Sequence, residues 1–101
     1  KRVEKESEAL SNTIAAEARA ARDAMRMLAH VVHELDNVIL PKAGQIERDL
    51  REAYSTGQTS LQDVLRARDR RLSLERQRLE ALRDFHLARI RHRAATGHTN
   101  P

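Results

Sequence analysis

The chain has 101 residues, with one Phe, one Tyr, no Trp and no Cys, and 34% of its residues are charged. So little bulk excludes a thick globular core, the lack of cysteine excludes disulfides and thiolate metal sites, and the abundance of Ala, Leu, Arg and Glu predicts an all-α fold of long helices. The net charge of +4 arises in residues 51–101, where 11 basic and 6 acidic side chains are spread around the expected helix without interleaved aromatics, so we expect no nucleic-acid partner.

Apolar residues at helical spacing predict a first helix over residues 4–54. Two heptad rows make one continuous apolar face along it, and a third row widens that face. The first row is Ile14, Ala21, Leu28 and Leu35, the second is Ala18, Met25, Val32, Ile39, Ile46 and Ala53, and the third is Ala24, Val31 and Val38. Pro41 removes a backbone donor and disfavours helical geometry at Leu40, so we expect a kink or short break near residues 37–42.

A turn is predicted at residues 55–60. Gly57 can adopt a positive φ where a helix ends, and Thr59 or Ser60 can cap the next helix. Asp63 follows Ser60 by three residues, which places a carboxylate near the positive end of that helix. Because the connection is short, the two helices should pack as a long antiparallel two-helix coiled-coil hairpin.

The second helix is predicted over residues 60–95, with Gly97 ending it and a frayed tail over residues 97–101. It carries two heptad rows, one of Leu65, Leu72 and Leu79 and the other of Ala67, Leu74, Ala81, Ala88 and Ala95. An offset of two residues rotates one row from the other by about 200°. A lone hairpin needs only one apolar side on each helix, so we expect this helix to lie in a curved wall with neighbours on both sides.

We expect the chain to be a segment of a longer protein. Folding it about Gly57 leaves residues 1–19 without a partner, and the sequence has no initiator Met. It also has no run of 18 apolar residues, and its opening KRVEKESE does not resemble a signal peptide. Any targeting or membrane segment is therefore expected elsewhere, and the isolated chain is expected to self-associate.

The histidines offer one candidate metal site. His30 and His33 lie three residues apart, and the hairpin would place His86 opposite them, so three imidazoles could converge on an ion. No carboxylate or cysteine shares an obvious inward face, so we prefer solvated or packed histidines, with no metal and no cofactor. The sequence has no nucleophile elbow, phosphate loop or paired acid and base, so we expect no enzyme activity.

The turn and the start of the second helix carry a longer motif. Its residues are Ala53, Tyr54, Gly57, Ser60, Leu61, Asp63, Val64, Leu65 and Ala67. They follow the pattern A-Y-x-x-G-x-x-S-L-x-D-V-L-x-A, which resembles the signature of the TolC family of outer-membrane efflux proteins. Leu40-Pro41 is similar to the Leu-Pro that commonly precedes this signature, and the match continues through Leu72, Leu74, Ala81, Phe85, Ala88, Ile90 and Gly97. The stretches DFHLARI and RAATG are more similar to the heavy-metal branch of that family than to its drug branch.

The resemblance implies a homotrimer whose membrane β-barrel continues as a trimeric α-barrel through the periplasm of a Gram-negative bacterium. This chain would be the last helical hairpin of each protomer, in a system that exports metal cations or drugs with an inner-membrane pump. Residues 54–63 would form the periplasmic tip, where the tunnel opens or closes and the periplasmic adaptor protein docks. The implied gate and adaptor-docking residues are Tyr54, Gly57, Thr59, Ser60, Asp63 and Arg66.

Alternatives stay open both for the roles of single residues and for the function of the whole chain. Some relatives have an arginine at the position of Thr59 and a second acid at the position of Arg66, so only half of their closing network is present. Asp63 could form a three-fold acidic ring or be a helix-start acid only, and Tyr54 could pack the end of the hairpin. The whole chain could also be the docking hairpin of a periplasmic adaptor, or a general coiled-coil interaction module, although the Asp-Val-Leu-x-Ala continuation and the opposite apolar sides favour the channel.

Overall fold

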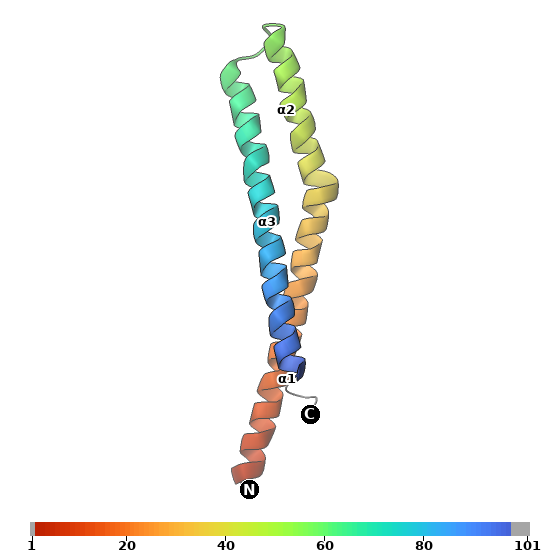
Figure 1. The fold of residues 1–101 in the computed structure, drawn as a ribbon, viewed down its shortest axis with the longest axis vertical. Coiled ribbons are helices and arrows are strands. Elements are labelled where there is room, and N and C mark those ends of the chain that lie inside the picture. Colours follow the sequence, from red (N-terminus) through yellow and green to blue (C-terminus); the bar gives the residue numbers. More distant parts are fainter. Residues whose placement is uncertain (1, 98–101) are drawn as a thin grey trace. The chain divides into compact units, whose positions relative to one another are not determined.

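Figure 1 shows the computed structural model, which describes residues 2–97. The predicted all-α fold is confirmed: these residues form α1 (Arg2–Glu34), the π-helical turn η1 (Leu35–Ile39), α2 (Leu40–Ser55) and α3 (Leu61–Gly97), without a strand. They group into two compact units, one comprising His30–Ala81 and the other the described part of Lys1–Ala29 and Leu82–Pro101. Gly97 is the last residue of α3, and the rest of the predicted tail, residues 98–101, lies outside the described residues.

In the unit His30–Ala81 the chain forms an antiparallel helical hairpin. The connection after α2 reverses the chain, so that α3 returns alongside α2 and η1 (Figure 1). Leu35, Ala43 and Leu74 make the buried core between them, and Leu40 packs against this core. The core is thin because few large side chains are available to fill it.

A π turn takes the place of the predicted kink. The N–H of Leu40 donates to the carbonyl oxygen of Leu35, five residues back. Leu40 is helical, with φ −64° and ψ −43°, so the expectation of non-helical geometry there is wrong. The reason is that α2 begins anew after the π turn and holds Pro41 in its first turn, where a missing N–H breaks no intrahelical hydrogen bond.

The π turn also changes which side chains are buried. One additional residue in a turn rotates all later residues by about 100° relative to a continuous α-helix. Ile39 and Ile46, which the heptad pattern predicts as buried, are 37% and 55% exposed, whereas Glu47 is only 4% exposed. The first two predicted rows are therefore right as far as Leu35 and wrong at Ile39 and Ile46, where Leu40 and Glu47 take the inner positions. The third row is wrong at Val31 and Val38, which are exposed.

α3 buries one of its two apolar rows and exposes the other. The buried residues of the first row are Leu74, Ala81, Ala88 and Ala95, with Ala67 partly buried. Leu65, Leu72 and Leu79, on the opposite side, are exposed, and we refer to them as the outer leucine row. The helix is therefore apolar on two sides, as the sequence predicts, and only one side is covered within the chain.

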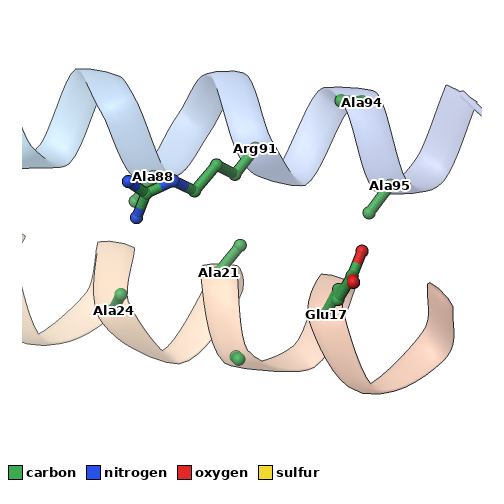
Figure 2. A pocket seen from close by; sticks show the side chains of 8 residues that line it. Glu17, Ala21, Ala24, Ala88, Arg91, Ala94 and Ala95 are labelled. Carbon is green, nitrogen blue, oxygen red and sulfur yellow. The ribbon is translucent and has the colours of Figure 1, made fainter. Parts of the chain in front are cut away.

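In the second unit, alanines line the space between α1 and α3. Ala21, Ala88 and Ala95 are buried, and Figure 2 shows Ala21 and Ala95 pointing toward the opposite helix. They border a groove of about 400 Å³ that is also lined by Glu17 and Arg91. Small side chains let two helix backbones approach closely, and alanines occupy the buried positions of this unit.

Candidate functional site

The candidate site is the tip of the hairpin, where α2 ends in a Schellman motif. The N–H of Gly57 donates to the carbonyl oxygen of Tyr54 at 3.0 Å, and the N–H of Gln58 donates to that of Ala53 at 2.8 Å. Gly57 has a φ of 77°, which confirms the predicted positive value. Only glycine takes this conformation without steric strain, and the two hydrogen bonds satisfy carbonyls that the end of the helix would leave free.

Three polar residues organise the start of α3. The N–H of Asp63 donates to the Ser60 Oγ atom at 3.3 Å, so Ser60 is the capping residue. The Thr59 hydroxyl donates to the Asp63 Oδ2 atom at 2.6 Å and so fixes the direction of the carboxylate. Hydrogen bonds from Thr59 first and Ser60 next, together with the positive charge of Arg66, hold the pKa of Asp63 below its ordinary value. The tip thus presents an ionised, oriented carboxylate beside the positive end of a helix.

Two of the sequence-predicted site residues stay outside this network. Tyr54 is 46% exposed. It contacts the turn through its backbone carbonyl oxygen, which accepts a hydrogen bond from the N–H of Gly57. Arg66 is exposed one turn after Asp63 and acts on it through charge, since no ion pair joins the two among the residues that the structure describes. Tyr54 and Arg66 are therefore available to groups beyond this hairpin.

The histidines do not assemble a metal site. Within residues 2–97 no three His, Cys, Asp or Glu side chains are placed to hold an ion together. The Nδ2 atom of Asn37 lies 3.1 Å from the Nδ1 atom of His33 and donates to the His33 carbonyl oxygen at 2.8 Å. His86 meets Phe85 edge to face, with ring centroids 5.8 Å apart. These local contacts give the structure no support for the metal candidate built on His30, His33 and His86.

An ion-pair network surrounds the buried Glu47 between α2 and α3, and the sequence pattern does not predict it. Glu47 is hydrogen-bonded by Arg71 of α3 and accepts from Arg51 at 2.8 Å, and Arg71 also donates to Glu75 at 3.0 Å. The hydrogen bond from Arg71 is the main reason that the pKa of Glu47 is lowered, and the same bond raises the pKa of Arg71. A carboxylate at 4% exposure is tolerated because several donors compensate its lost hydration.

A second pair joins η1 to α3 beside the π turn. Arg78 is hydrogen-bonded to Asp36, and this contact raises the pKa of Arg78. The Glu47–Arg71 pair depends on the one-residue shift, because a continuous α-helix would turn Glu47 away from α3. A signal for the shift exists in the sequence. Leu40 follows Ile39 by one residue, and Ala43 and Leu50 lie one residue after positions 42 and 49, to which the first heptad row would extend.

Comparison with known proteins found no similar protein. The chain matches no protein-family model, no curated protein and no solved structure. Over residues 2–97, no helix has the length and apolar character needed to cross a membrane.

Proposed function

We propose that this chain is the last periplasmic hairpin of an outer-membrane efflux channel of the TolC type. In this proposal it forms part of the tunnel wall of a homotrimer, and its tip docks a periplasmic adaptor protein that connects the channel to an inner-membrane pump. The proposal needs no enzymatic step. The channel conducts metal cations or drugs passively, and its selectivity depends on the side chains that line the tunnel wall.

The outer leucine row of α3 is the observation that carries this proposal. Leu65, Leu72 and Leu79 are exposed on the side of α3 opposite the buried Leu74. A helix with two apolar sides needs a neighbour on each of them, and a closed wall of helices supplies that arrangement. An adaptor hairpin or a simple two-helix coiled coil would leave the second side in water.

The tip geometry supports the proposal as well. The Schellman turn leaves Tyr54 and Gly57 exposed at the end of the hairpin, where an adaptor can reach them. Asp63 lies one turn into α3 with its carboxylate held by Thr59. Three such carboxylates around a narrow passage favour cations, and Arg66 on the next turn offsets their mutual repulsion.

The proposal is tested on the intact channel protein that contains this segment. We expect it to fractionate with the outer membrane as a trimer and to conduct ions in planar lipid bilayers. Asp63→Asn should lower the cation preference without abolishing assembly, and Arg66→Asp should increase block by multivalent cations. Asp69→Asn, about 240° further around α3, is the matched control and should leave selectivity unchanged. A monomeric protein without conductance would exclude the channel and favour the adaptor or coiled-coil alternative.

A further inference from the structure

A groove runs between η1 and α2 on one side and α3 on the other, within the unit His30–Ala81. Its volume is about 270 Å³, and we call it the isoleucine groove. It is lined by Val38, Ile39, Lys42, Ala43, Ile46, Ala67, Arg70 and Leu74. Ile46 is the most exposed of its aliphatic side chains, at 55%, and the π turn is the reason that this residue faces the groove instead of the core.

The two sides of the hairpin differ in whether their charged side chains form ion pairs within the chain. On the side of the buried network, Glu47 and Asp36 are held by Arg71 and Arg78. On the groove side, no ion pair joins Lys42 or Arg70 to a carboxylate anywhere in residues 2–97. The groove therefore has an apolar floor and two cationic side chains but no acid among its lining residues.

We propose that the isoleucine groove docks an amphipathic helix of a different protein, with aliphatic side chains on its inner face and carboxylates along its edges. Ile39 and Ile46 are one heptad apart, which matches the spacing of side chains on a packed partner helix. Lys42 and Arg70 can lay their methylene stems on the apolar floor and extend their charges to the rim, where acidic side chains of the partner would meet them. This inference concerns the hairpin alone and does not depend on the channel proposal.

The probe is a pair of synthetic four-heptad helical peptides that share Ile and Leu at the core positions. One carries Glu at all edge positions and the other carries Lys. Binding of each labelled peptide to the full chain is followed by fluorescence anisotropy, at a chain concentration below the onset of self-association in sedimentation. We expect the acidic peptide to bind on the order of tenfold more tightly than the basic one.

Variants assign this preference to the groove. Lys42→Glu combined with Arg70→Glu should reverse it, and Ile46→Glu should abolish binding of both peptides while the helical circular dichroism is kept, because Ile46 is exposed. The matched control is Arg48→Glu with Arg76→Glu, which changes the same charge on the same two helices about 200° away from Ile46 and Leu74. This control should keep the preference for the acidic peptide.

Three results would overturn the inference. One is equal binding of the two peptides, and another is a preference that the control pair removes as fully as the groove pair does. The third is that neither peptide binds while Ile46→Glu abolishes self-association of the chain. In that case a second copy of this chain, not an acidic partner, occupies the groove.

Discussion

Gly57 determines where the chain reverses. Its φ of 77° strains any residue with a Cβ atom, while the space around it is open, since an added Cβ would meet nothing within 4 Å. We therefore expect Gly57→Val to destabilise the fold by about 1 kcal/mol or more through backbone strain alone, and Gly57→Asn to cost less because Asn tolerates this conformation. Urea unfolding measures both, at one fixed chain concentration.

Gly44 provides the control for this experiment. It lies inside α2, and an added Cβ would be 3.5 Å from the Nη1 atom of Arg48, an ordinary contact. Gly44→Ala should therefore stabilise the chain by about 0.5–1 kcal/mol. If Gly57→Val proves as neutral as a surface change, the positive φ at the tip is wrong.

Asp63 makes the tip sensitive to acid. Its pKa is lowered in the folded chain, so its stabilising contribution is complete above the ordinary value of 3.8 and is lost as the pH falls through the lower folded value. Thr59→Val removes the largest cause of this shift, so the pKa of Asp63 should rise toward 3.8 and the loss of stability in acid should become smaller. The pKa of Asp63 is measured in both chains from the pH dependence of its carboxyl ¹³C chemical shift by NMR.

The control for Asp63 is Thr56→Val. The Thr56 hydroxyl donates to backbone carbonyls of Glu52 and Ala53, so its removal should leave the Asp63 titration as it is in the parent chain. An unchanged titration in Thr59→Val would show that the short contact between Thr59 and Asp63 does not persist in solution.

Glu47 and Arg71 should behave as a unit. Arg71→Leu leaves the buried carboxylate of Glu47 with a hydrogen bond from Arg51 only, and the side chain of Arg51 is 60% exposed. We therefore expect Arg71→Leu to lower the melting temperature more than Arg51→Leu does. The double change Glu47→Leu with Arg71→Leu should recover most of that loss, because it removes the charge along with its partner. Melting curves of the parent chain and of these three variants decide it, and a double variant less stable than Arg71→Leu would contradict the reasoning.

At the level of the helices, the heptad pattern predicted the fold class correctly. It did not predict which side of α2 faces α3. Helical periodicity correctly indicated that Leu35 of the first segment and Leu74 of the second are buried. It misplaced Ile39 and Ile46 because a period of seven assumes an uninterrupted α-helix, and the π turn adds a residue that no periodicity contains. Pro41 indicated an interruption near residues 37–42, and the structure has one as a π turn in Leu35–Ile39, although Leu40 itself stays helical.

The phase of α2 can be measured by truncation. Leu74 is 4% exposed and Ile46 is 55% exposed. Leu74→Ala should therefore cost about 2–5 kcal/mol, whereas Ile46→Ala should cost less than about 1 kcal/mol. A continuous heptad row would make the two losses similar. Urea unfolding of both variants at one concentration distinguishes the two arrangements, and a large loss for Ile46→Ala would mean that α2 is rotated back into the unshifted phase.

At the scale of the chain, composition and spacing could predict long helices and the antiparallel hairpin of the unit His30–Ala81, because each helix is locally consistent with that hairpin. The tip was predictable for the same reason: Gly57 and Ser60 act through their own backbone and their nearest neighbours. The ion pairs of Glu47 and Asp36 were not, because contacts between distant segments depend on a rotation that only the folded chain fixes. The function proposed for the tip requires neighbours beyond the hairpin, so the proposal of a TolC-type role rests on the motif and on the outer leucine row.

That outer row gives the last prediction. Leu65, Leu72 and Leu79 leave one side of α3 apolar and exposed, so the isolated chain should self-associate through it, and its melting temperature should rise with chain concentration. Replacing all three leucines with Glu should shift the chain toward monomer in sedimentation velocity and remove the concentration dependence, while the helical signal at low temperature persists. Ile46→Glu also places a charge on an exposed apolar residue, yet it lies in the isoleucine groove and should leave self-association intact. A parent chain that sediments as a monomer with a high, concentration-independent melting temperature would mean that the exposed leucines need no partner, and the main support for a wall of helices would then be lost.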